Sequence, residues 1–146
     1  MSLAELTVRT PVDAPAGTVW RVLTDWERQS EWMVGTTVRL TRGDGHSIGS
    51  ELAARTGVGP VGFTDTMEII MWEPPRRCEV LHTGRLVRGV GSFTVEPASA
   101  AAATVVWTER LDLPLGVLGR WGWPLVRPAF RAGVRRSLTR LARLCE

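Results

Sequence analysis

Residues 13–33, DAPAGTVWRVLTDWERQSEWM, decide the fold class, because two short helical turns follow directly on a strand-like segment. Asp13 and Pro15 predict a helix start there. An aspartate side chain caps free backbone N–H groups, and proline lacks the N–H that the first turn leaves unused. Val19 and Leu23 fall on one helical face, and the tryptophans of this stretch provide large apolar anchors for whatever lies underneath.

Alternating and β-branched residues surround this stretch and predict seven strands. We expect them at residues 5–12, 36–41, 48–56, 61–72, 78–83, 86–95 and 104–112. Apolar residues at helical spacing over residues 118–145 predict a long final helix, with a break near residues 121–128 caused by Pro124 and Pro128. The order of elements indicates an α+β fold, in which helices cover one face of an antiparallel sheet.

The length and composition indicate one domain over residues 1–146. No stretch has the pattern of a secretory signal, and no apolar run approaches the ~18 residues that a membrane span requires. We therefore expect a cytoplasmic protein. Cys78 and Cys145 are far apart in sequence and lack metal-ligand spacing, which predicts reduced thiols.

Charge is distributed unevenly along the chain. All eighteen basic side chains are arginines, and lysine, asparagine and tyrosine are absent, as a high-GC genome explains. Residues 1–117 carry eleven arginines against fourteen acidic residues, a balance of −3, whereas residues 118–146 carry seven against Glu146 alone, a balance of +6. Six of these seven are the candidate contacts of the final helix: Arg127, Arg131, Arg135, Arg136, Arg140 and Arg143. Such a helix suits an anionic membrane surface, an acidic partner or plain solvent.

Four motifs resemble a known superfamily. They are APAGTVWRVLTDWERQSEW at residues 14–32, WEPPRR at 72–77, GSFTVEP at 91–97 with TVVWTERLDLPLG at 104–116, and RRSLTRLARLCE at 135–146. Together they resemble the START-like or SRPBCC superfamily over nearly the whole chain, in particular its bacterial polyketide cyclase/dehydrase and lipid-transport branch. The resemblance implies the helix-grip fold: a curved seven-stranded antiparallel sheet with two short helices after its first strand, and a long C-terminal helix over a hydrophobic cavity.

Small residues on the inner helix face and glycines in one strand leave volume for a ligand between helix and sheet. Methionines and aromatic residues of matching strand parity provide adaptable apolar walls. The predicted cavity lining is Phe63, Met67, Met71, Gly89, Gly91, Phe93, Trp107, Phe130, Gly133, Val134 and Ser137. The alternative is that the same residues close-pack a solid core.

Three side chains, Glu109, His82 and Arg85, are candidates for acid–base chemistry, and Asp65, which shares the parity of Phe63 and Met67, is a further carboxylate to which the same alternatives apply as to Glu109. Glu109 shares the parity of Trp107, and a carboxylate among apolar neighbours exchanges protons near neutral pH or pairs with an arginine. His82 lies within a strand, whereas His46 lies in a turn and is predicted to be exposed. Arg85 is a candidate because cyclases of the superfamily hold polyketones with cavity arginines. Clustered metal ligands and a phosphate-binding loop are absent from the sequence, so we expect no cofactor.

The leading hypothesis is binding or carriage of a small hydrophobic molecule: a lipid, isoprenoid, quinone or polyketide. The first alternative is a polyketide cyclase or dehydrase that uses Glu109, His82 or Arg85 as acid, base or oxyanion holder. The second is peripheral docking of the basic helix to an anionic membrane or acidic partner. Nucleic acid is not predicted, since the arginines lack interleaved exposed aromatics. Both a monomer and a homodimer are compatible with the sequence.

Overall fold

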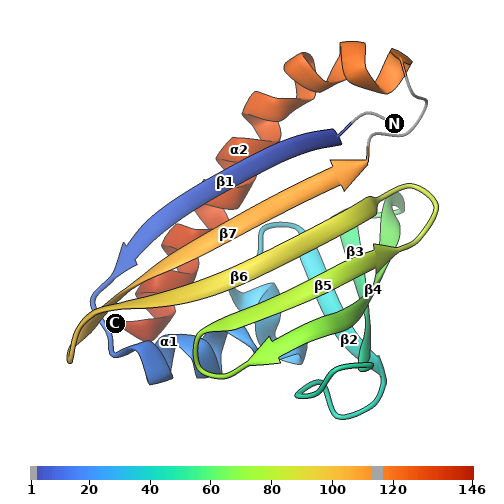
Figure 1. The fold of residues 1–146 in the computed structure, drawn as a ribbon. Helices are drawn as coiled ribbons and strands as arrows, with labels where there is room; N and C mark the ends of the chain where they lie inside the picture. Colours follow the sequence, from blue (N-terminus) through green and yellow to red (C-terminus); the bar gives the residue numbers. More distant parts are fainter. Residues whose placement is uncertain (1–2, 113–116) are drawn as a thin grey trace.

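The computed structural model describes residues 3–112 and 117–146 and contains a seven-stranded antiparallel sheet (Figure 1). The strand order is β1-β7-β6-β5-β4-β3-β2, so every chain-consecutive pair from β2 to β7 is a hairpin and β1 lies at the far edge beside β7. The strands are β1 (Leu3–Val12), β2 (Thr36–Arg42), β3 (Glu51–Val58), β4 (Val61–Glu73), β5 (Arg77–Thr83), β6 (Arg88–Ser99) and β7 (Ala102–Asp112). The predicted helix-grip sheet is confirmed.

Two short helical segments follow β1, namely α1 (Ala16–Leu23) and η1 (Trp26–Glu31), the second of which is a 3-10 helix. The predicted Asp13 cap is wrong. Pro15 occupies the cap position in an extended conformation, and no side chain caps α1. Asp13 instead donates its backbone N–H to Oε2 of Glu146, at 3.0 Å. This hydrogen bond joins the start of α1 to the end of the chain.

The long helix α2 (Val117–Cys145) is continuous through Pro124 and Pro128, so the predicted break is wrong. Each proline removes one N–H bond to the carbonyl four residues earlier. Both prolines are exposed, so water can satisfy the freed carbonyls. Figure 1 shows α2 crossing the sheet and changing direction along its length, as prolines cause when they bend a helix without ending it.

The second half of α2 is anchored to the core. Val134, Leu138 and Leu141 are buried against the sheet. Ser137 is also buried; its Oγ donates to the carbonyl of Gly133 at 2.9 Å and accepts the backbone N–H of Val34 at 3.0 Å. This half of the helix is therefore held both by apolar burial and by a hydrogen bond to the segment after η1.

Candidate functional site

A cavity of about 580 Å³ lies between the sheet and α2. Its size is within the range of small-molecule sites. Strands β2 to β7, η1 and α2 contribute to its walls, which are mainly apolar. The predicted residues that line it are Phe63, Met67, Gly91, Phe93, Trp107, Phe130, Gly133, Val134 and Ser137. Their role toward a ligand stays a prediction.

Met71 and Gly89 do not line the cavity, contrary to the prediction. In β4 the pairing with β5 shifts register between Ile69 and Met71, so that Met71 pairs with Glu79 instead of continuing the inward alternation. Gly89 has a φ of +122°, and a side chain there would point into the carbonyl oxygen of Arg110. Strict period-two alternation therefore fails at Met71, whereas Gly89 keeps the inward register, opposite His82 and Leu111, and has no side chain to face the cavity.

Three titratable side chains meet at the cavity wall: Asp65 on β4, His82 on β5 and Glu109 on β7. Nδ1 of His82 lies 3.0 and 2.9 Å from the two carboxylate oxygens of Asp65. Its Nε2 lies 3.0 Å from Oε2 of Glu109. The other Glu109 oxygen, Oε1, accepts the indole N–H of Trp107 at 2.9 Å. We call Asp65, His82 and Glu109 the polar cluster.

The polar cluster holds its histidine in the charged form. Burial alone lowers the pKa of His82, but the hydrogen bonds and charges of Asp65 and Glu109 outweigh that effect and raise the pKa to about 10. At neutral pH both ring nitrogens are therefore protonated, and each donates to a carboxylate. One imidazolium between two carboxylates leaves a net single negative charge at the cavity wall.

Gly91 makes the contact between β7 and β5 possible. Glu109 pairs with Gly91 of β6, and Gly91 pairs with Val80 of β5, so the Glu109 carboxylate must reach across an entire strand to meet His82. A Cβ at Gly91 would stand 3.0 Å from both carboxylate oxygens, closer than such contacts normally are. The glycine therefore leaves the path that the glutamate side chain occupies.

The sequence pointed to His82, Glu109 and Asp65 separately and did not predict that the three side chains meet. Asp65 shares the parity of two predicted lining residues, Phe63 and Met67, and that parity was the available signal. Arg85, the third candidate, is exposed between β5 and β6 and lies outside the cavity lining. The structure thus unites two of the three predicted side chains and leaves the arginine apart.

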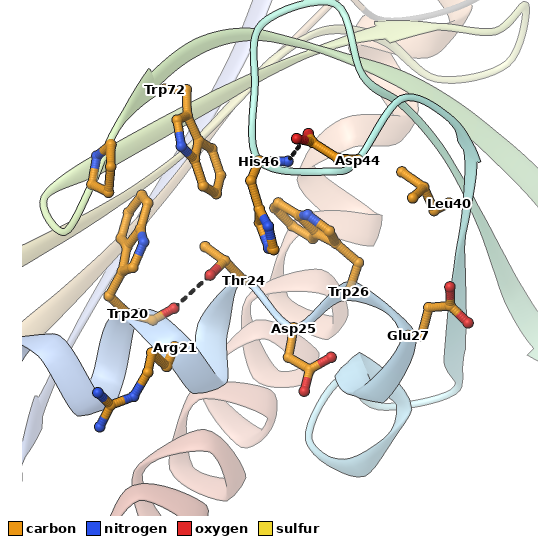
Figure 2. A pocket seen from close by; sticks show the side chains of 11 residues that line it. Trp20, Arg21, Thr24, Asp25, Trp26, Glu27, Leu40, Asp44, His46 and Trp72 are labelled. Atoms are coloured by element: carbon orange, nitrogen blue, oxygen red, sulfur yellow. Dashed lines mark hydrogen bonds between the residues drawn. The ribbon is translucent and has the colours of Figure 1, made fainter.

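A second pocket, of about 660 Å³, lies outside the sheet-and-helix cavity, between α1, η1 and the loop after β2 (Figure 2). Trp20 and Trp72 pack with ring centroids 5.1 Å apart, and the exposed His46 ring lies 5.5 Å from Trp72. The indole N–H of Trp26 donates to the carbonyl of Gly45 at 2.7 Å. These rings therefore pack mainly against one another, and the inner cavity is the better candidate site.

Residues 4–146 match the family described as polyketide cyclase / dehydrase and lipid transport. The chain belongs to this family. The resemblance found in the sequence motifs is thereby confirmed, and this membership connects the cavity to proteins grouped by cyclase, dehydrase and lipid-transport activities. No curated protein matches the chain.

Several solved structures share the fold at low sequence identity. An aromatase/cyclase, Zhui from Streptomyces sp. R1128, is 16% identical with a TM-score of 0.80 over 99% of this chain and 94% of that chain. The protein TTHA0849 from Thermus thermophilus is 16% identical with a TM-score of 0.81, over 96% and 95%. Norcoclaurine synthase from Thalictrum flavum is 14% identical with a TM-score of 0.72, over 98% and 86%. At these identities the likeness establishes the fold alone.

The described residues show neither a metal-binding cluster nor a membrane-spanning helix. Within residues 3–112 and 117–146, no group of three histidine, cysteine or acidic side chains has an arrangement suited to a metal ion. Among the helices of the same ranges, none is both long enough and apolar enough to cross a membrane.

Proposed function

We propose that this protein binds and carries a small hydrophobic molecule that has a hydroxyl group or a similar hydrogen-bond donor. The observation that carries the proposal is the polar cluster set into an otherwise mainly apolar cavity of about 580 Å³. Apolar walls supply affinity through burial, and a few fixed polar groups determine orientation. The family match over residues 4–146 supports a hydrophobic ligand.

The chemistry of the polar cluster favours a ligand with a neutral hydrogen-bond donor over a ligand with a carboxylate. Each carboxylate oxygen has two acceptor positions, and the hydrogen bonds to His82 and Trp107 leave acceptor capacity on Asp65 and Glu109. An alcohol, phenol or enol satisfies that capacity. A fatty acid brings a second negative charge to a site that already carries one, which is costly where water is largely excluded.

Two matched probes test this ligand class. We expect dodecanol to bind at least about tenfold more tightly than dodecanoate, a difference of about 1.4 kcal/mol, in displacement of a fluorescent apolar dye at neutral pH. Glu109→Gln removes a negative charge and is expected to reduce that preference. Equal binding of alcohol and acid by the wild-type protein contradicts the proposed ligand class, whereas binding of neither probe contradicts the cavity as a lipid site.

A pair of glycine variants tests the location of the ligand. Gly133 lines the cavity and has open space around its Cβ position, so Gly133→Leu places a large side chain in the cavity. Gly17 is also helical with open space at its Cβ position, but it lies outside the cavity lining, and Gly17→Leu is the matched control. We expect dye and dodecanol binding to fall only in Gly133→Leu. Similar binding by both variants contradicts the location.

A second candidate function is cyclisation of a polyketone, favoured by the hydrogen-bonded carboxylate–imidazolium pair at the cavity wall. In that reaction Glu109 takes a proton from a carbon between two carbonyls. The enolate attacks a third carbonyl carbon of the same molecule, and the new alkoxide takes the proton back from Glu109. His82 positions the carboxylate and stabilises its charge. Conversion of a model polyketone whose rate and pH profile are unchanged by Glu109→Gln contradicts this candidate.

A further inference from the structure

The cavity opens at one end of the molecule. Two residues there, Phe63 and Val126, both line the cavity and remain exposed, with 39% and 57% of their surface accessible. The lining also includes Val87 from the β5–β6 connection and Trp123 from the first half of α2. The mouth therefore lies between the turns of the sheet and the start of α2, which Figure 1 shows at the same end of the fold.

Large apolar side chains project from the segments that surround this mouth. Trp121 and Leu125 of α2 are 76% and 84% exposed, and Val58 and Val61, which flank the β3–β4 turn, are 84% and 77% exposed. Leu86, in the β5–β6 turn, is 55% exposed. Single exposed apolar residues are common on protein surfaces, but several that gather around one opening indicate an interaction site.

The same segments carry positive charge. Residues 55–64, 83–90 and 121–131 contain Arg55, Arg85, Arg88, Arg127 and Arg131, and none of these segments contains an acidic residue. Arg55, Arg85 and Arg88 are exposed. Arg131 contacts the sheet instead, where its Nη1 lies 3.4 Å from the carbonyl of Thr7. The mouth therefore combines projecting apolar side chains with exposed arginines.

We propose that this end of the protein docks on an anionic lipid bilayer. The docking surface, which we call the mouth surface, comprises Val58, Val61, Leu86, Trp121, Leu125 and Val126 with Arg55, Arg85 and Arg88. Apolar side chains enter the boundary between headgroups and acyl chains, and arginines bind the anionic headgroups. The cavity mouth then faces the bilayer, the source or destination of a hydrophobic ligand.

The mouth surface is a smaller and differently placed membrane contact than the whole basic helix that the sequence suggested. The arginines of the second half of α2, including Arg136 and Arg143, lie away from the mouth and are exposed beside the core-facing helix face. The mouth surface has both kinds of side chain that a peripheral contact uses, and it surrounds the opening. The contact is therefore assigned to the start of α2 and the sheet turns, and the exposed arginines of the second half of α2 stay in solvent.

Vesicle flotation of the purified full chain tests the proposal without any added ligand. We expect the protein to float with phosphatidylcholine vesicles that contain phosphatidylglycerol, and not with pure phosphatidylcholine, and to be released by high salt. An arginine near an anionic surface contributes about fivefold in partitioning, so Arg85→Gln with Arg88→Gln should weaken flotation about 30-fold. The matched control, Arg136→Gln with Arg143→Gln, should float as the wild type does.

A second pair of variants tests the apolar part. Trp121→Ser with Leu125→Ser alters only exposed side chains and should weaken flotation by about tenfold or more. The control Ile48→Ser removes an exposed apolar residue from the β2–β3 loop and should leave flotation unchanged. Far-ultraviolet circular dichroism establishes that each variant is folded.

Three outcomes overturn the proposal. The first is absence of flotation with anionic vesicles at low salt. The second is equal loss in the mouth and control variants, which means that the contact is not confined to the mouth surface. The third is a wild-type protein that forms a dimer and does not float, together with a Trp121→Ser, Leu125→Ser variant that is a monomer. That result identifies the mouth surface as an interface between two copies. Ligand binding in the dye assay is independent of all three, so the two proposals fail separately.

Discussion

Raising the pH is expected to destabilise the fold through His82. Burial lowers the pKa of this histidine, but the hydrogen bonds and charges of Asp65 and Glu109 outweigh burial and raise the pKa from an ordinary value of 6.5 to about 10. A folded-state pKa above the unfolded value gives a stabilisation that is complete below the unfolded pKa and is lost as the pH rises through the folded pKa. At about 1.4 kcal/mol per pKa unit, the charged histidine contributes ~5 kcal/mol.

The pH dependence is measurable in a window where the cysteines contribute little. Between about pH 7 and about pH 8.5 an unfolded chain has released nearly one more proton than the fold, so the free energy of unfolding should fall by ~2 kcal/mol. Cys78 and Cys145 have an ordinary pKa of 9.0, so their partial ionisation in the unfolded chain adds only a few tenths of a kcal/mol to this fall by about pH 8.5. Urea unfolding followed by tryptophan fluorescence, at constant ionic strength, measures the change.

A charge-removing variant and a direct titration provide the controls. Asp65→Asn with Glu109→Gln removes both charges that hold the proton, so its free energy of unfolding should be nearly constant across the same window. In His46→Gln only one histidine remains, and its ring signals in an NMR titration report the pKa of His82 directly. A midpoint near 6.5, or a wild-type free energy of unfolding that does not fall with pH, refutes this account of the polar cluster.

Burial raises the pKa of Cys78 to about 12, and Cys78 is fully buried whereas Cys145 is only partly buried. A thiol reagent should therefore label Cys145 first and Cys78 only after unfolding. Equal labelling rates in the folded protein would contradict the packing. Leu141→Ala should lower the free energy of unfolding by ~3 kcal/mol, since the side chain is fully buried, and a loss below about 1 kcal/mol would show that α2 is not anchored there. Gly91→Ala should cost about 1–3 kcal/mol of unfolding free energy, because its new methyl group meets the Glu109 carboxylate. In a Glu109→Ala background that cost should disappear, and a persistent cost would locate the conflict elsewhere.

The strands were predictable from sequence because most of them bury one face only. In β7 the pattern of residues 104–112 identified the strand, and Trp107 and Glu109 line the cavity as their shared parity predicted. The β3 boundary was less accurate, since Ile48 lies in an exposed loop and the strand begins at Glu51. Alternation indicates a strand reliably within its buried part and poorly at its ends.

The errors at the prolines of α2 and at Met71 have the same cause: a rule that depends on local sequence alone was overridden by the surrounding fold. Pro124 and Pro128 were expected to break the final helix, yet the cost of a missing hydrogen bond is limited where water reaches the backbone. Met71 was expected to face inward, yet a register shift in β4 reverses the alternation after Ile69. Solvent exposure and pairing irregularities depend on elements far away in sequence, and a local pattern contains no information about them.

The polar cluster depends on a relation that involves four strands. Sequence parity identified Glu109 and Gly91 separately and assigned the glycine to leaving volume for a ligand. In the fold, the carboxylate of Glu109 occupies that volume and reaches His82 across β6. A glycine in a strand interior normally weakens packing. Here its missing side chain allows the Glu109 carboxylate to pair with the buried His82, which lies two strands away from Glu109 on β5. The role of Gly91 becomes interpretable only once the register places it between Val80 of β5 and Glu109 of β7. The same register explains why a side chain introduced at Gly91 would disturb the charged groups at the cavity wall.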